Sequence, residues 1–486
     1  MLFNSYEFIF FFLPFTFFIY FYLLQLRLIT GAKAFLVFAS LFFYSWWNIL
    51  YLPIILASML FNYIIGNALN NSLEHTKVDK KTLLIFGIVV NLALLGYFKY
   101  SDFLIENINI SLDVSLPLLH LALPLAISFF TFQQIAYLVD SYRKETKEYD
   151  FLNYALFVTF FPQLIAGPIV HHKEMMPQFM SSWNLVKNYK NISAGIFIFS
   201  IGLFKKVIIA DQFSIWANSG FDATSTLNLL ESWSTSLSYT FQLYFDFSGY
   251  TDMAIGAALL FNIKLPVNFN SPYKALNIQD FWKRWHITLS RFLKEYVYIP
   301  LGGNRKGSFR TYNNLLATFI IGGIWHGAGW TFLFWGFLHG MALVIHRFWQ
   351  KLGIILPKFL AWFITFNFIN IAWVFFRAKE WNDAIAIVSS MFGLNGIVLY
   401  TSLEGKLSYL KHFGVEFDII FTHMQGDTII LKWLIPTFII VLFTKNSIQK
   451  LDEFTYNRKN TWLSLGLFIF GVLSLHKVSE FLYFNF

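Results

Sequence analysis

One histidine of this sequence lies in a glycine-rich passage of a strongly hydrophobic stretch. Four glycines (Gly322, Gly323, Gly327 and Gly329) occur within eight residues around His326, and glycine at this density disfavours an uninterrupted helix and lets backbone segments approach closely. An imidazole in apolar surroundings stays neutral and can take a proton from a hydroxyl nucleophile. We therefore interpret His326 as a candidate catalytic base. The alternative is a buried histidine that hydrogen-bonds a backbone carbonyl.

Two tryptophans and a further histidine accompany His326. Trp325 and Trp330 flank it and are expected to keep water away. His339 follows 13 residues later, so a single continuous helix would place the two histidines about 20 Å apart on different faces. We therefore expect His339 to have a supporting role at most, unless the chain folds back, and a purely structural role is the alternative.

Two aspartates lie in the apolar run 228–261. Asp246 and Asp252 occur in the passage YFDFSGYTD, and ionisable residues within membrane segments are costly and are functional candidates by default. We expect them to orient a histidine or to hold a water path. A structural polar network is an equally open interpretation.

The segment 264–310 concentrates positive charge. It contains nine Lys or Arg residues and two acidic residues, a net charge of +7. On a helical wheel of Phe281–Lys294 the four basic side chains share one face and the aromatic residues the other, with His286 at the edge of the apolar face. This pattern predicts an amphipathic helix in the membrane interface, which either anchors the protein or attracts a polyanionic donor. The candidate donor-binding residues are Lys283, Arg284, Arg291, Asn304 and Arg305.

Several kinds of chemistry are excluded by the composition and the motifs. The sequence has no cysteine, which excludes disulfides, thiolate metal sites and an acyl-cysteine intermediate within this chain. His171 and His172 are adjacent and lack a third ligand at metal-binding spacing, so we expect no metal site. Neither a G-x-S-x-G elbow nor an H-E-x-x-H helix occurs. We expect no bound cofactor.

The elements that must position these residues are membrane helices. The 486 residues are 57% hydrophobic and 13% charged, whereas soluble domains carry about 25% charged residues. Apolar runs of about 20 residues predict an all-α polytopic membrane protein, a single domain over residues 1–486 with about 10–12 spans, some of them re-entrant or interfacial. The net charge of +9 lies in the loops between these runs, which fits the positive-inside pattern and not nucleic-acid binding.

The charged loops also predict an orientation. The apolar run 8–24 has no preceding basic residue, so we expect a retained span with its N-terminus outside and not a cleaved signal peptide. Pro162, Gly167 and Pro168 predict a broken or re-entrant segment at 152–170. The polar interval 377–428 is expected to form a loop with short helices. The basic loops expected inside contain Arg27, Lys77, Lys80, Lys81, Arg143, Lys144 and Lys147.

Together these passages resemble the membrane-bound O-acyltransferases, in particular the bacterial branch that acetylates alginate and peptidoglycan. The resemblance covers most of the chain, and the end of the chain after about Arg377 resembles the family least. The matching passages are MLFNS at 1–5, FPQLIAGP at 161–168, YFDFSGYTD at 244–252, FWKRWH at 281–286, YIPLGGN at 298–304 and WHG at 325–327.

The resemblance implies a helical funnel around a thinned membrane centre, with acetyl-CoA as a donor substrate that enters from the cytosol. His326 matches the signature histidine of the family and His286 its second motif histidine. The implied location is the bacterial cytoplasmic (inner) membrane, as a multi-pass protein in contact with lipid. The implied acceptor is an envelope polysaccharide, with peptidoglycan favoured and alginate next, reached directly or through a periplasmic or secreted acetyltransferase partner.

Two other classes of function stay open at this point. A multi-span transporter or flippase would use the intramembrane His and Asp residues as a relay. An interaction scaffold for a secreted enzyme would not need the chemistry of His326.

Overall fold

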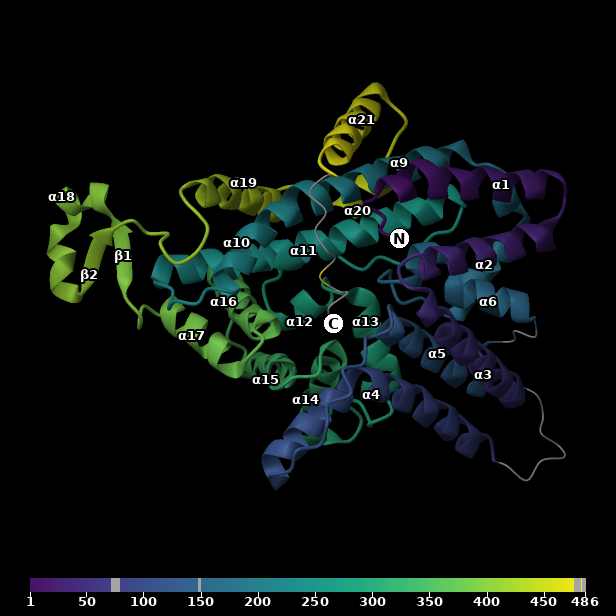
Figure 1. Ribbon diagram of the computed structural model, residues 1–486, viewed down its shortest axis with the longest axis horizontal. Coiled ribbons are helices and arrows are strands. Elements are labelled where there is room, and N and C mark those ends of the chain that lie inside the picture. Colours follow the sequence, from purple (N-terminus) through teal and green to yellow (C-terminus); the bar gives the residue numbers. More distant parts are fainter. Residues whose placement is uncertain (71–78, 147–149, 476–481, 483–486) are drawn as a thin grey trace.

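The computed structural model describes the chain except for residues 71–78, 147–149, 476–481 and 483–486, so the predicted positions of Lys77 and Lys147 lie outside the described residues. Helices dominate, and the prediction of an all-α polytopic membrane protein is confirmed. Helices α1 (Leu13–Gln25), α9 (Tyr189–Phe204) and α11 (Leu229–Leu260) run along the long axis, whereas α3 (Leu52–Asn70), α4 (Lys80–Leu112) and α21 (Arg458–Leu473) are inclined to it (Figure 1).

The first half of the chain forms these elements: η1 (Glu7–Phe12), α1 (Leu13–Gln25), α2 (Ile29–Ser45), η2 (Ile49–Tyr51), α3 (Leu52–Asn70), α4 (Lys80–Leu112), α5 (Ile127–Tyr142), α6 (Phe151–Thr159), α7 (Phe161–Leu164), α8 (His172–Met180), η3 (Ser182–Leu185), α9 (Tyr189–Phe204), η4 (Lys205–Ala210), α10 (Asp211–Phe221) and α11 (Leu229–Leu260). The second half forms η5 (Pro272–Lys274), α12 (Ile278–Trp282), α13 (Ile287–Phe292), η6 (Leu293–Tyr298), α14 (Gly307–His326), α15 (Trp330–Leu352), α16 (Lys358–Arg377), α17 (Trp381–Met391), β1 (Ile397–Tyr400), η7 (Thr401–Leu403), α18 (Glu404–Leu407), η8 (Ser408–Phe413), β2 (Val415–Asp418), α19 (Ile429–Phe443), α20 (Ser447–Asp452) and α21 (Arg458–Leu473).

Six helices in the described part of the chain are long and apolar enough to cross a membrane. They are Glu7–Gln25, Ile49–Asn70, Lys80–Leu112, Tyr189–Phe221, Trp330–Leu352 and Lys358–Arg377, and α2 and α19 are shorter apolar helices. The total number of spans therefore stays a prediction.

The centre of the molecule is built around α11. This helix packs against α9 so closely that glycines are required where the two backbones meet. A Cβ atom on Gly202 would lie 2.6 Å from the carbonyl oxygen of Gly249, and one on Gly256 would lie 2.6 Å from that of Gly195. The small residues thus let two long helices approach to backbone contact, as is typical of membrane bundles.

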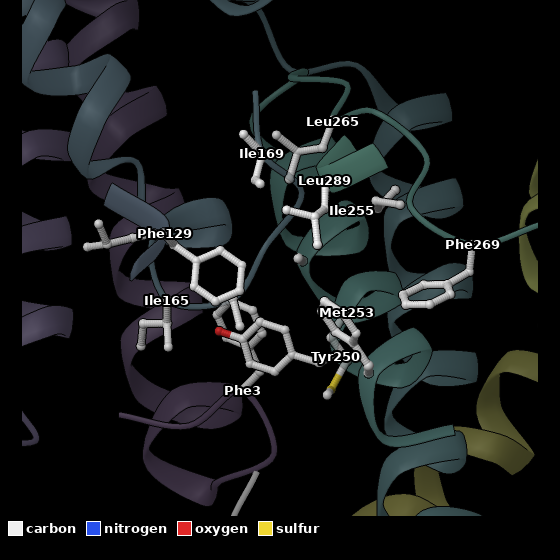
Figure 2. Close-up of a cluster of buried hydrophobic side chains, with 14 of the residues drawn as sticks. Phe3, Phe129, Ile165, Ile169, Tyr250, Met253, Ile255, Leu265, Phe269 and Leu289 are labelled. Carbon is white, nitrogen blue, oxygen red and sulfur yellow. The ribbon is translucent and has the colours of Figure 1, made fainter. Parts of the chain in front are cut away.

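A cluster of buried apolar side chains joins distant parts of the sequence at this centre. Figure 2 shows Phe3 of the N-terminal segment beside Tyr250 and Met253 of α11, with Phe129 of α5 and Ile165 close by. The rings of Phe3 and Tyr250 stack with their centroids 4.7 Å apart. The N-terminus is therefore part of the core that supports α11.

The predicted interruption at 152–170 is confirmed. Helix α6 ends at Thr159, Phe160 adopts a non-helical ψ of 109°, and the short α7 ends at Leu164 before the chain reaches Gly167 and Pro168. All residues from 160 to 170 are buried within the protein. Irregular backbone at this place is accordingly covered by protein.

The predicted amphipathic helix Phe281–Lys294 is wrong. The segment forms α12 and α13 with a break at His286, and its aromatic side chains point into the bundle: Phe281, Trp285 and Phe292 are each 3% exposed or less. An interior segment that exposes only its charged residues has the same periodicity as an interfacial helix, so the pattern alone does not separate the two.

The interval 377–428 contains more structure than predicted. It forms α17, three short helical segments (η7, α18 and η8) and a two-stranded parallel sheet in which Ile397 pairs with Val415. Strands β1 and β2 and helix α18 form a small lobe at the left end of the molecule (Figure 1).

Candidate active site

His326 is the last residue of α14, at the point where the chain turns back into α15. A Cβ on Gly327 would lie 2.2 Å from the Phe332 ring, and one on Gly323 would lie 2.4 Å from the carbonyl oxygen of Phe332. The glycines therefore allow both the turn and the close packing of α14 against α15. The predicted interruption is confirmed, and it falls just after His326.

Aromatic rings enclose the imidazole of His326, which is 4% exposed. The centroids of the Trp325, Trp335 and Phe376 rings lie 4.9, 5.1 and 5.0 Å from that of His326. Trp330 does not take part in this enclosure, contrary to the prediction. Its side chain is 58% exposed and donates a hydrogen bond to Asn107, because it lies beyond the turn at the start of α15.

His286 occupies the break between α12 and α13 and is fully buried. Its φ of 43° is left-handed, a strained conformation for a residue with a side chain that is often found at functional sites. The N–H of Ile287 donates to the carbonyl oxygen of Asn268 and holds the break. The Trp325 ring neighbours both candidate histidines, with its centroid 6.3 Å from that of His286 and 4.9 Å from that of His326.

The tautomer of His286 follows from its partner Asn268. Asn268 Oδ1 accepts from the backbone N–H and the hydroxyl of Thr288, at 3.2 and 3.0 Å, so this atom is the amide oxygen. His286 Nδ1 lies 3.2 Å from the same oxygen and must donate to it. A neutral His286 therefore carries its lone pair on Nε2.

His339 has the opposite tautomer and lies nearer to His326 than a continuous helix would place it. The indole N–H of Trp282 donates to His339 Nδ1 at 3.2 Å, and tryptophan only donates, so a neutral His339 carries its proton on Nε2. The turn after His326 brings α15 back along α14. Trp335 then contacts both histidines, with centroid distances of 5.1 Å to His326 and 4.8 Å to His339.

Two residues of α4, Lys99 and Tyr100, hold the end of α14, and neither was predicted from the sequence. Lys99 Nζ donates to the carbonyl oxygens of Trp325 and His326 at 2.6 and 2.9 Å. The hydroxyl of Tyr100 donates to the carbonyl oxygen of Ile324 at 2.6 Å. The only available signal was a lysine inside an apolar run.

Asp246 and Asp252 pair with lysines, and the expectation that they orient a histidine is wrong. Lys206 lies 2.6 Å from Asp246 and 2.9 Å from Asp211, and Lys205 lies 2.7 Å from Asp252. The lysines come from η4, a π-helical turn that faces α11, and these ion pairs form a polar network of the kind that the structural interpretation predicts. The N–H of Leu482 also donates to Asp246, at 3.1 Å.

The candidate donor-binding residues divide into engaged and exposed side chains. Arg284 forms an ion pair with Asp280 at 2.8 Å, and Arg291 binds both carboxylate oxygens of Glu174 at 2.6 and 3.0 Å. The other three are exposed at the protein surface: Lys283, Asn304 and Arg305. Lys274 lies near Arg284. Its pKa is lowered first by partial burial and secondly by the positive charge of Arg284.

A second polar cluster contains His171, which the sequence analysis considered only as a metal ligand. The hydroxyl of Tyr296 donates to Asp140 at 2.7 Å and lies 3.0 Å from His171 Nδ1. Among the described residues no three His, Asp or Glu side chains are grouped so that they could hold a metal ion.

Comparisons with known proteins agree with the resemblance in the motifs. The sequence profile described as MBOAT, membrane-bound O-acyltransferase family, matches residues 7–379. A peptidoglycan O-acetyltransferase of Helicobacter pylori is 50% identical over an alignment that covers 100% of this chain and 98% of that protein.

More distant relatives carry other names. A probable alginate O-acetylase of Pseudomonas aeruginosa is 38% identical over 90% of this chain and 81% of its own length. A teichoic acid D-alanyltransferase of Bacillus subtilis is 29% identical over 53% of this chain and 69% of its own length. The profile match and the identity over the full length establish that this chain belongs to the membrane-bound O-acyltransferase family and is a multi-pass membrane acyltransferase.

Proposed function

We propose that this protein is a membrane O-acetyltransferase that moves acetyl groups from cytosolic acetyl-CoA across the membrane to hydroxyl groups of a cell-envelope polysaccharide. The observation that carries the proposal is the aromatic enclosure in which Trp325 contacts both His326 and His286. The relative from Helicobacter pylori supports peptidoglycan as the favoured acceptor, with alginate next.

In the proposed reaction His326 acts as a general base. It takes the proton of the acceptor hydroxyl while the hydroxyl oxygen attacks the thioester carbonyl carbon. The C–S bond then breaks, the acetyl group stays on the acceptor oxygen, and the CoA thiolate takes up the proton held by His326. In a two-step variant an imidazole nitrogen of His326 attacks the thioester carbonyl, the C–S bond breaks and CoA leaves as the thiol with the imidazole proton. The acceptor hydroxyl then attacks the acetyl-imidazole, the C–N bond breaks and the hydroxyl proton returns to the imidazole. Neither route requires a metal or a bound cofactor.

The surroundings of His326 suit this role. The rings of Trp325, Trp335 and Phe376 limit access of water, which would otherwise compete with the acceptor for the acetyl group. His286 is the proposed second catalytic residue, since its Nδ1 donates to Asn268 and its Nε2 is left as the basic atom of the neutral ring.

The proposed setting is the bacterial cytoplasmic membrane. The cationic segment 264–310 would face the cytosol, where the exposed Lys283 and Arg305 raise the local concentration of a polyanionic donor. A periplasmic partner would either present the polysaccharide or receive the acetyl group and pass it on.

The test uses membranes that contain this protein together with cell-envelope polysaccharide. They are supplied with acetyl-CoA that carries a label in the acetyl group. The proposal predicts release of free CoA and label in alkali-labile esters on peptidoglycan fragments. Alginate added as a second acceptor distinguishes the two polysaccharides. A transporter or flippase would leave the thioester intact, and unchanged acetyl-CoA with no esterified label would contradict the proposal.

A further inference from the structure

The ammonium group of Lys99 is satisfied by two backbone carbonyls at the end of α14 and by one hydroxyl of α5. Its three N–H bonds have three acceptors: the carbonyl oxygens of Trp325 (2.6 Å) and His326 (2.9 Å) and the hydroxyl of Ser128 (3.4 Å). It also lies 6.0 Å from the centroid of the Trp325 ring. A lysine that uses every donor in this way has none left for a substrate.

No carboxylate in the described part of the chain forms an ion pair with Lys99. A cation inside a membrane helix without a counter-ion is costly, and such residues usually serve a function. Its favourable interaction here is with the C-terminal end of α14, where the helix dipole is negative and the last carbonyls lack partners within the helix. That end is His326.

Tyr100 adds a second contact from the same helix. Its hydroxyl donates to Ile324 at 2.6 Å, so α4 binds three successive carbonyls of the last turn of α14, at Ile324, Trp325 and His326. The turn that follows is rich in glycine and would otherwise be free to adopt several conformations. The hydrogen bonds from Lys99 and Tyr100 hold the backbone of His326 in a single conformation.

We propose that Lys99 is a positioning residue for His326: it fixes the end of α14 so that the imidazole meets the reacting atoms in one orientation. This inference rests on the proposed function. A misplacement of a catalytic group by about 1 Å costs on the order of 100-fold in rate. Loss of Lys99 should therefore lower kcat by about that factor and leave the KM for the donor thioester nearly unchanged, because Lys99 does not touch the donor.

The experiment compares Lys99→Met with Lys80→Met in purified protein. Lys80 is a matched control, since it lies in the same helix and also donates to a carbonyl at the end of another helix, Leu69 at 2.9 Å. The kcat of Lys99→Met should fall by about 100-fold, whereas the kcat of Lys80→Met should equal that of the wild type. Both variants should give equal yields of monodisperse protein. Tyr100→Phe should lose less than Lys99→Met, since it removes one bond and no charge.

Two results would overturn the inference. One is a kcat for Lys99→Met within twofold of the Lys80→Met value, and the other is a raised KM for the donor thioester with an unchanged kcat. If Lys99→Met does not fold, Lys99→Arg and Tyr100→Phe carry the same comparison, and wild-type kcat in both would overturn it. His326→Ala is measured alongside. Activity in His326→Ala contradicts the proposed function, whereas its inactivity together with an active Lys99→Met contradicts only the role of Lys99.

Discussion

Hydrogen-bond partners assign opposite tautomers to two of the histidines in the enclosure around His326. Asn268 accepts from Nδ1 of His286, whereas Trp282 donates to Nδ1 of His339. In their neutral forms His286 therefore offers a basic Nε2 and His339 a proton on Nε2. Only the first is suited to accept a proton at that atom. The distance argument against His339 does not hold, because the chain folds back after His326, and a supporting role for His339 now rests on its tautomer.

Asn268 is the residue on which this arrangement of His286 depends. Its Oδ1 accepts from His286 and twice from Thr288, so Asn268→Ala should leave buried donors unsatisfied and reduce the free energy of unfolding by about 1–3 kcal/mol. It should also reduce kcat strongly, because the tautomer of His286 is no longer fixed. Thermal unfolding in detergent and steady-state kinetics measure the two effects.

The control for this prediction is Asn91→Ala. Asn91 is also buried and exchanges side-chain hydrogen bonds with Asn62, at 2.7 and 3.1 Å. Asn91→Ala should lower the free energy of unfolding about as much as Asn268→Ala does, and its kcat should equal that of the wild type. Equal kcat in the two variants would show that Asn268 has a structural role only.

At the scale of elements, the hairpin of α14 and α15 explains what the sequence could and could not predict. The glycines around His326 predicted an interruption, and one occurs. Its position after His326 depends on the Phe332 ring, which fills the space beside Gly327, and a local pattern does not contain that contact. The prediction of one helix over Phe281–Lys294 was wrong for a related reason. A segment inside the bundle and a helix in the membrane interface can have the same hydrophobic periodicity, so the local pattern does not separate them.

The packing of this hairpin is tested by Gly323→Ala. The new Cβ would lie 2.4 Å from the carbonyl oxygen of Phe332 and 3.1 Å from Cα of Gly336. These are backbone atoms, so the helices must separate, at a cost of about 1–3 kcal/mol in stability and with loss of activity because His326 moves. Unfolding temperature and acetyl transfer are measured together.

Gly329→Ala is the matched control for the hairpin. Its nearest contact would be an ordinary 3.5 Å to the Phe332 ring, and its φ of −178° suits any residue. This variant should behave like the wild type. A Gly323→Ala protein of normal stability and activity would contradict the tight helix contact.

At the scale of the whole molecule, composition and motifs were sufficient for the fold class and the family, but not for contacts between distant segments. Lys99 and His326 are 227 residues apart, and the lysine partners of Asp246 and Asp252 come from another helix. Such pairs depend on how the helices assemble, which periodicity does not record. The lobe around β1 and β2 was missed because its strands are only four residues long.

The distribution of charge over the molecule yields a prediction about donor capture. Lys283 is exposed, whereas Arg291 is held by Glu174. Lys283→Glu should raise the KM for acetyl-CoA several-fold at low salt, and the difference from wild type should shrink as salt screens the charge. Arg291→Gln should change stability more than KM. A KM for Lys283→Glu that equals the wild-type value at low salt would leave Lys283 without a role in donor binding.

Envelope O-acetylation in cells that carry His326→Ala shows whether His326 performs the acetyl transfer. Envelope O-acetylation is quantified in cells that produce either the wild-type protein or His326→Ala, with equal amounts of folded protein in the membrane verified for both. His326→Ala should insert and fold normally, and its O-acetylation should fall to background. O-acetylation near the wild-type level in His326→Ala would contradict a catalytic role for His326.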